Sequence, residues 1–346
     1  MNPLIQFTTT DDGVRIAYYT MGRGVPFVAT SELQWGHLGA TLGFKEHYRS
    51  NSPGGIGPGL QIVRYDARGT GLSDRSAIDF SLPAQERELQ AILDALGLER
   101  FVLFGHMHGS LLAISYASRH PERVSHLVLS IPHARGRDLR PYSENFGMQT
   151  LKDITPEQWE AYTRTMALAL FGFHPTRAAE TVAQSYRESM TPESYRAFTE
   201  WRETSDVTDL LGEVRVPTLV LSRRTNTRPR LEVDVAAGIP GVLIVTNDAD
   251  PEVPGRWLPE ETEAVLEFLG ISPPTDAFED NSAPRLTPRE LEILSLIVAG
   301  QSNRLVAETL VLSERTVARH IANIYEKTGV HGRAEVTAYA LRHRLV

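Results

Sequence analysis

Short apolar runs alternate with helical patterns over roughly the first 270 residues, and this alternation restricts the fold more than any other feature. Six runs have the length and composition of buried strands, at residues 26–30, 60–66, 101–105, 126–130, 217–221 and 242–245. Helical patterns occur at residues 82–96, 110–119 and 259–269. Strands that alternate with helices favour a mostly parallel sheet with helices on both faces. An Asp-Gly turn between runs 5–9 and 14–20 predicts a leading β-hairpin.

The composition is that of a folded chain and excludes several classes of protein. Of the 346 residues, 41% are hydrophobic, which excludes a mainly disordered chain. The absence of cysteine excludes a disulfide framework, a thiolate metal site and a cysteine nucleophile. No apolar run reaches the length of about 18 residues that a membrane helix needs, and the first residues lack the features of a signal peptide. We therefore expect a cytoplasmic protein that does not enter a membrane.

The chain is predicted to divide at residues 271–285, ISPPTDAFEDNSAPR. This segment has three prolines, three acidic residues and no strand or helix periodicity, so it is interpreted as a linker between a body, 1–270, and a tail, 286–346. The whole chain has a net charge of −8, but residues 285–346 hold nine basic and six acidic side chains. A charge of +3 on residues 285–346, against −11 on residues 1–284, suggests that the tail contacts a polyanion.

The strand signal disappears between residues 137 and 212, where the sequence is helical and rich in aromatic residues. An insertion of this size between two strands must lie over one edge of the sheet. A helical lid over a binding pocket, at about 138–212, is the functional interpretation. A helical embellishment without a ligand is the alternative.

Three motifs of the body resemble those of α/β-hydrolases. They are YDARGTGLSD at 65–74, GHMHG at 105–109 and HPERV at 120–124. The first resembles the turn that follows the fourth strand of these enzymes, and the second lies where they place the G-x-S-x-G nucleophile elbow. The resemblance covers roughly residues 1–270 and implies an α/β-hydrolase fold with a helical lid. Asp66 and Arg68 of the first motif are expected to hold a structural turn through a buried ion pair.

The catalytic positions that the resemblance implies hold residues unable to form a triad. Met107 stands at the nucleophile position, and a thioether has no proton to lose. Asn226 aligns with the acid and Pro251 with the histidine, and no histidine lies between His174 and His320. We therefore expect a pseudo-hydrolase without catalytic residues. The alternatives are a hydrolase whose chemistry has moved to Ser110 or His108, and a metal site at His106 and His108; neither a cysteine nor a suitably spaced carboxylate completes a ligand set.

Loss of the nucleophile does not remove the pocket that the resemblance implies. Carboxyl ends of parallel strands, covered by a lid, form a concave and mostly apolar site that suits a small organic effector. Methionine at the floor of such a site offers a polarisable surface that packs well against aromatic rings. Neither a cofactor nor a metal is expected. The candidate ligand-binding residues are Trp35, His37, His106, Met107 and His133.

The tail has the signals of four helices. The first is predicted from Pro288, behind a Thr287 cap with Glu290 three residues on, to about Ala299 before Gly300. Further helices are predicted at 304–310, 314–328 and about 333–344. A short helix, a tight turn and a longer helix form a helix-turn-helix, whose second helix enters the major groove of DNA.

The sequence of the tail, which runs from LTPRELEIL to IYEKTGV at 286–330, resembles the LuxR-type, or GerE-like, DNA-binding domain; the resemblance covers about sixty residues. The resemblance implies a double-stranded DNA operator as partner. Arg319 is best placed to contact a base edge, because arginine can bridge O6 and N7 of guanine. Phosphate contacts are expected from Arg315, Thr316 and Lys327, and from residues at the start of the preceding helix. The full set of expected DNA-binding residues is Ser302, Asn303, Arg315, Thr316, Arg319, His320, Asn323 and Lys327.

These features together predict a ligand-responsive LuxR-family transcription regulator that binds two half-sites as a homodimer. In this hypothesis an inactive α/β-hydrolase-like body senses a small organic effector. Two other hypotheses stay open at the level of sequence. One is a bifunctional protein that retains esterase activity through relocated residues, and the other is a constitutive DNA-binding protein whose body only dimerises.

Overall fold

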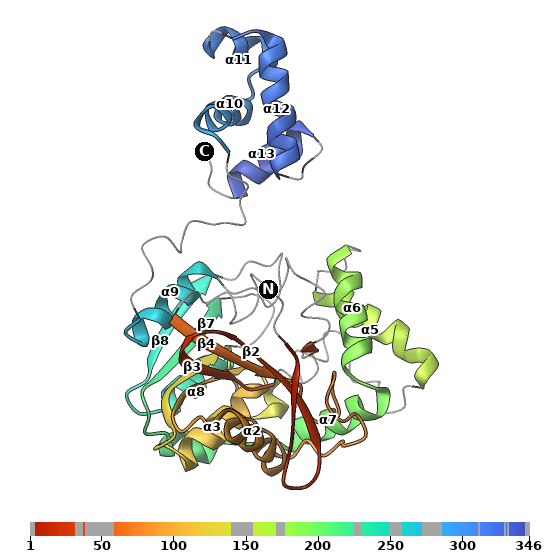
Figure 1. Cartoon of the computed structure of the whole chain (residues 1–346), viewed down its shortest axis with the longest axis vertical. Coiled ribbons are helices and arrows are strands. Elements are labelled where there is room, and N and C mark those ends of the chain that lie inside the picture. The colour runs from red at the N-terminus through yellow and green to blue at the C-terminus, as the bar shows by residue number, and fades with distance from the viewer. Residues whose placement is uncertain are drawn as a thin grey trace. The chain divides into compact units, whose positions relative to one another are not determined.

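One sheet of eight strands forms the centre of the first unit in the computed structural model (Figure 1). The structure describes residues 4–31, 37–38, 59–139, 155–170, 177–224, 230–248, 258–271, 286–310, 312–328, 330 and 332–342. The chain divides into two compact units, Met1–Pro273 and Pro274–Val346.

The strand order is β1-β2-β4-β3-β5-β6-β7-β8. The strands span Gln6–Thr9 (β1), Arg15–Gly22 (β2), Gly24–Ala29 (β3), Gly59–Tyr65 (β4), Phe101–His106 (β5), Val124–Ser130 (β6), Thr218–Arg224 (β7) and Leu243–Asp248 (β8). The pairs β1–β2 and β2–β4 are antiparallel, and every later pair is parallel. The predicted hairpin and all six predicted strands are therefore confirmed, as is the α/β class.

Helices cover both faces of this sheet because its strands are apolar on both sides. One face packs against α2 (Leu82–Leu96), α3 (Gly109–Arg119) and α8 (Leu231–Gly238). The other packs against α9 (Pro259–Phe268), with Val265 and Leu266 in the shared core. Along β5, Val102 and Phe104 point to the α9 side while Phe101 and Leu103 point to the α2 and α3 side. This alternation is what a buried parallel strand requires.

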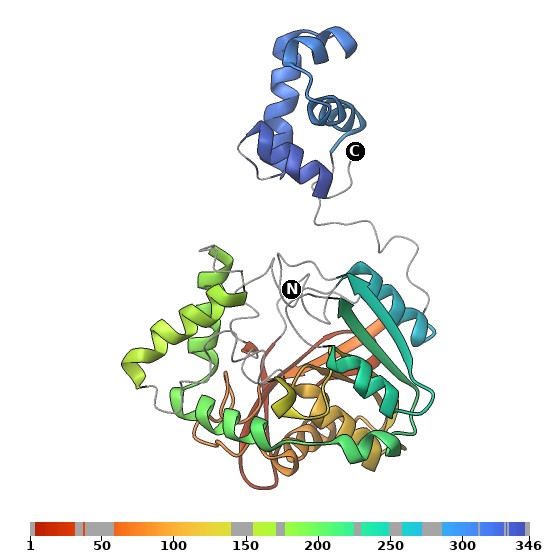
Figure 2. The same cartoon turned by 180° about the vertical axis from the view of Figure 1, so that it is seen from behind.

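The described part of the predicted lid segment is helical. It comprises η3 (Gly136–Leu139), α5 (Pro156–Leu170), α6 (Arg177–Ser189), α7 (Pro192–Thr204) and η5 (Thr208–Glu213). Helices α5 and α6 pack on each other and lie on the side of the unit away from β8 (Figures 1 and 2). The lid is joined to the turn after β4, where the Ser194 hydroxyl donates to the Gly69 carbonyl at 2.6 Å and the Gly71 amide donates to the Ser189 carbonyl at 2.8 Å.

The second unit consists of α10 (Pro288–Val298), α11 (Asn303–Leu310), α12 (Glu314–Thr328) and α13 (Arg333–Arg342). The four predicted helices are confirmed, with ends that differ by two residues or fewer. At the start of α10, the Glu290 amide donates to Thr287 Oγ1 and the Thr287 amide donates to Glu290 Oε2, so the expected capping box is present. The apolar faces of all four helices meet in one core of fully buried residues: Ile293, Leu294, Ile297, Val306, Val317, Ile324, Val336 and Ala340.

Candidate functional site

The turn between β5 and α3 has the backbone strain of a nucleophile elbow. Met107 lies at its apex with φ +44°, a left-handed conformation that is unfavourable for a side chain of this size. The flanking glycines allow the tight turn, because a Cβ on Gly105 would lie 2.8 Å from the Ala113 Cβ, and one on Gly109 would lie 2.3 Å from Thr30 Oγ1. The fold thus keeps the geometry that presents a side chain at the strand ends, and the side chain presented is a thioether.

Ser110, the nearest hydroxyl after the elbow, is fully buried and bonded to the backbone. Its Oγ donates to the Met107 carbonyl at 2.5 Å and lies 3.2 Å from the His133 carbonyl oxygen. The His133 amide in turn donates to the Ser110 oxygen at 3.4 Å. These contacts fasten α3 to the segment after β6, and the structure gives this hydroxyl no imidazole partner among the described residues.

Two buried imidazoles contact each other beside the elbow. His108 Nδ1 lies 3.2 Å from His133 Nε2, with the rings edge to face at 5.0 Å. Burial lowers the pKa of His108 well below its usual value, and the neighbouring His133 and Arg202 lower it further. His108 is therefore neutral at physiological pH, and the two rings share one hydrogen bond. The third imidazole, His106, is half-buried, and its Nδ1 lies 3.2 Å from the Ser130 hydroxyl.

His106 and Met107 lie at the elbow, and His133 contacts His108 beside it; their binding of a ligand stays a prediction. His37 is half-buried in the segment after β3, where burial lowers its pKa. Trp35 lies outside the described residues, and so do Asn226 and Pro251, which were aligned with the acid and the histidine.

Sequence reasoning missed the lid residues that approach the elbow. On α7, Phe198 packs edge to face against His108 at 5.2 Å between ring centroids. Arg202, one helical turn later, is buried and lies close enough for its charge to affect His108. The signal was available, because Tyr195, Phe198 and Arg202 recur at the spacing of one helix face.

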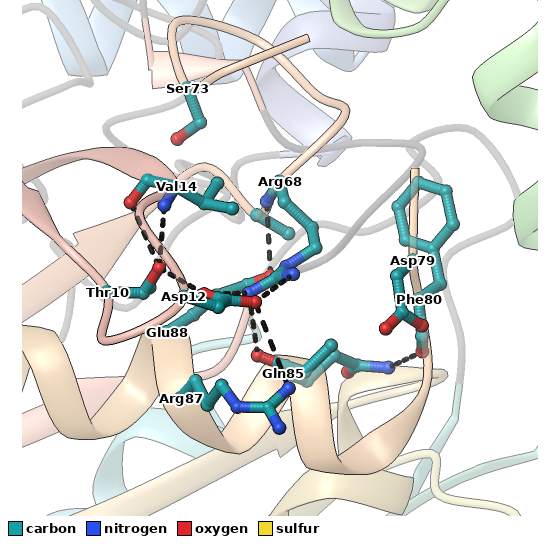
Figure 3. A network of polar contacts seen from close by, with 12 residues as sticks. Thr10, Asp12, Val14, Arg68, Ser73, Asp79, Phe80, Gln85, Arg87 and Glu88 are labelled. Atoms are coloured by element: carbon teal, nitrogen blue, oxygen red, sulfur yellow. Dashed lines mark hydrogen bonds and ion pairs between the residues drawn. The ribbon is translucent and has the colours of Figure 1, made fainter. Parts of the chain in front are cut away.

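The turn after β4 needs a correction, because Asp66 and Arg68 do not pair with each other. Asp66 is fully buried, and its carboxylate accepts hydrogen bonds from the amides of Leu38 at 3.0 Å and Leu72 at 2.8 Å. Arg68 instead donates to Glu88 at 2.7 Å and to Asp12 at 2.9 Å, which Figure 3 shows as one network. A buried carboxylate can be satisfied by amides alone, so the turn is structural as expected but by different bonds.

Within the described residues, no group of three or more His, Cys, Asp or Glu side chains could hold a metal ion. Nor does that part of the chain contain a helix both long and apolar enough to cross a membrane.

In the second unit, α12 presents the side chains expected to read DNA. Arg315 and Arg319 are exposed, and Thr316 and Asn323 are half-buried. Ser313 caps the helix, since its Oγ accepts from the Thr316 amide at 3.1 Å. His320 is half-buried, and its Nδ1 has no hydrogen-bond partner in the described part of the chain.

Three residues expected to contact phosphate have partners inside the unit. The Ser302 hydroxyl accepts from the Leu305 amide at 3.3 Å and so caps α11. Asn303 Oδ1 accepts from Arg333 at 3.2 Å. Lys327 forms an ion pair of 2.7 Å with the buried carboxylate of Glu290, so the structure gives this lysine a stabilising role that the sequence did not indicate.

Comparison with known proteins assigns each unit to a family. The family described as "alpha/beta hydrolase fold" matches residues 27–229, and the one described as "Bacterial regulatory proteins, luxR family" matches residues 284–340. The transcriptional regulatory protein MctR of Rhizobium johnstonii is 47% identical over 68 residues, which are 20% of this chain and 31% of that protein. This chain therefore spans about a third of the regulator that it matches.

Other similar proteins match the first unit. A 2-hydroxy-6-oxo-6-phenylhexa-2,4-dienoate hydrolase of Comamonas testosteroni is 26% identical over 51% of this chain and 64% of that enzyme. A solved hydrolase from Pseudomonas aeruginosa superposes with a TM-score of 0.60 at 21% identity, over 77% of this chain and 98% of that structure, which shows a shared fold. The chain belongs to the α/β-hydrolase-fold family and carries a LuxR-family DNA-binding regulatory domain as its second unit.

Proposed function

We propose that this protein is a transcription regulator whose hydrolase-fold unit binds a small organic effector without hydrolysing it. The LuxR-type unit binds operator DNA, as a homodimer on two half-sites. The observation that carries the proposal is Met107 at the positive-φ apex of the elbow, where a hydrolase of this fold needs a nucleophile.

The side chains around Met107 support a binding role. A thioether has no proton for a base to remove, so it cannot be activated as a hydroxyl is. The hydroxyl of Ser110 is bonded to backbone carbonyls, the His108–His133 pair is buried, and burial keeps His108 neutral. The similar hydrolase of Comamonas testosteroni is named for a small organic substrate, a phenylhexadienoate, which favours a small organic effector here.

The absence of hydrolysis is tested with p-nitrophenyl acetate and p-nitrophenyl butyrate on the purified full chain. We expect a rate equal to that of the Met107→Ala variant, because neither side chain can act as a nucleophile. Turnover that is lost in Ser110→Ala or His108→Ala, in variants that keep the wild-type tryptophan fluorescence, would establish the bifunctional hydrolase instead.

DNA reading is tested after the operator has been selected from random DNA with the full chain. Arg319→Ala is expected to cost about 1–3 kcal/mol on the selected site and to relax sequence preference at one position. Arg304→Ala is the comparison variant, because Arg304 is an exposed arginine on α11 that forms an ion pair of 3.0 Å with Glu308. A loss in Arg319→Ala that is uniform across all sequences would make Arg319 a phosphate contact.

Effector binding is tested by thermal shift against small aromatic acids, esters and amides. A ligand present at 100 times its dissociation constant stabilises the folded unit by about 2.7 kcal/mol. The absence of a shift with any member of a broad panel would favour the constitutive regulator with a dimerisation body.

A further inference from the structure

The lid holds two buried hydrogen-bond donors that have no partner among the described residues. They are Trp159 Nε1 on α5 and Arg202 Nε on α7, and each residue is only 8% exposed. Both groups donate and cannot accept. Because nearly all buried polar groups are hydrogen-bonded in folded proteins, two unpaired donors on helices whose aromatic side chains contact each other indicate a place for an acceptor.

A continuous series of aromatic contacts connects Trp159 to the elbow, and Arg202 lies on the helix that provides two of its rings. Trp159 lies 5.4 Å from Tyr195 and 5.5 Å from Tyr162 between ring centroids, and the two tyrosine hydroxyls are hydrogen-bonded at 2.7 Å. Tyr195, Phe198 and Arg202 follow one another on one face of α7, and Phe198 contacts His108. The face of α7 that carries Arg202 therefore lies between α5 and the elbow.

Among the described residues, the charge of Arg202 is only partly neutralised. In the part of the chain that the structure describes, Arg202 forms an ion pair only with the adjacent Glu203, at 3.4 Å between Nη2 and Oε1. This contact is long for a charge-assisted hydrogen bond, and it engages one of the five guanidinium donors. The imidazoles of the neighbouring His108–His133 pair supply no negative charge. An anionic group beside Arg202 would neutralise the guanidinium charge and accept a hydrogen bond from its unpaired Nε.

We propose that Arg202 and Trp159 bind the carboxylate of the effector, and that the aromatic side chains of α5 and α7 contact its apolar body. A planar guanidinium suits a carboxylate because it can donate two parallel hydrogen bonds, and an indole N–H adds a third donor. The inference rests on the proposed function, in that it takes the first unit to be an effector-binding unit. It adds the chemical class of the effector: an organic monocarboxylate with an aromatic or other apolar body.

The test compares benzoate with benzamide, its neutral isostere, by calorimetric titration of the full chain. We expect benzoate to bind at least about tenfold more tightly than benzamide, because only the carboxylate carries a charge for Arg202. The Arg202→Gln substitution should weaken the binding of benzoate by about tenfold or more and leave the affinity for benzamide little changed. The Trp159→Phe substitution keeps an aromatic ring and removes the N–H, so it should weaken the binding of both probes by a smaller factor.

Arg196→Gln is the matched control, because Arg196 is an exposed arginine on the same helix. This variant should bind benzoate as the wild type does. If Arg202→Gln loses the wild-type tryptophan fluorescence, Arg202→Lys replaces this variant, since lysine keeps the charge and loses the paired donors.

Equal affinities for benzoate and benzamide, or benzoate binding that is unchanged in the Arg202 and Trp159 variants, would overturn the carboxylate site. Failure of the wild type to bind benzoate or hexanoate at millimolar concentration would overturn it as well. In either case a thermal shift with a neutral member of the panel would leave the proposed function standing, so the two failures can be distinguished.

Discussion

Asp66 is a buried carboxylate whose nearest partners are amides. It connects the segment after β3, through Leu38, to the turn after β4, through Leu72. A Cβ on Gly71 would lie 2.2 Å from Asp66 Oδ2, so the carboxylate also requires the glycine of the turn, which has φ +50°. Burial raises the pKa of Asp66 to about 7, and the two amide hydrogen bonds oppose this shift only in part.

The raised pKa of Asp66 predicts that the free energy of unfolding depends on pH through this residue. Between pH of about 4, the pKa of an unfolded aspartate, and about 7, the native state retains a proton that the unfolded state releases. The contribution of Asp66 to the free energy of unfolding therefore falls as pH rises through this window. Asp66→Asn cannot titrate and should lose this part of the slope, although it lowers stability at every pH.

The measurement is urea unfolding at several pH values, followed by tryptophan fluorescence. All four tryptophans (Trp35, Trp159, Trp201 and Trp257) lie in the first unit, so the signal reports that unit. Other groups titrate too. Hydrogen bonds from Arg68 and Thr10 lower the pKa of Asp12 to about 2, so Asp12 contributes stability that is lost below pH of about 4. The quantity to compare is thus the difference between wild type and variant. Identical slopes from pH 4 to 7 would contradict the prediction.

At the scale of elements, one glutamate joins the first and third helices of the DNA-binding unit. Glu290 completes the capping box of α10 and accepts the ion pair from Lys327 in the last turn of α12. Its side chain is buried, while that of Lys327 is about a third exposed. The orientation of α12 against α10 therefore depends on this contact and on the apolar core beneath it.

Lys327→Ala is expected to loosen this helix pair while leaving the number of phosphate contacts unchanged. The predicted cost is about 1 kcal/mol, within the range for a partly exposed ion pair, and about 2 kcal/mol for Glu290→Ala, which also removes a cap. Hydrogen exchange of the α10 and α12 amides measures the loosening. The salt dependence of DNA binding should keep its slope. A slope reduced by about one, with amide protection unchanged, would restore the phosphate contact that the sequence predicted.

For the whole molecule, the sequence predicted the elements better than the contacts between them. Strands and helices were found because apolar periodicity and capping residues are local signals. The partners of Asp66, Arg68 and Lys327 were missed because each bond joins segments that are distant in the chain. The lid face of Tyr195, Phe198 and Arg202 was missed for the same reason: its spacing is visible in the sequence, but which side faces the elbow depends on how α7 packs.

Regulation requires that the two units influence each other, and the placement of the tryptophans makes this measurable. If the effector changes operator affinity by some factor, thermodynamic linkage requires the operator to change effector affinity by the same factor. We expect benzoate to change operator affinity by about fivefold or more, a typical coupling, and the selected operator to change benzoate affinity equally. Arg202→Gln should abolish both effects and retain the operator affinity of the ligand-free wild type. Benzoate that binds the first unit, seen by tryptophan fluorescence, without any change in operator affinity would show that the two units act independently and that this acid is not a regulatory signal.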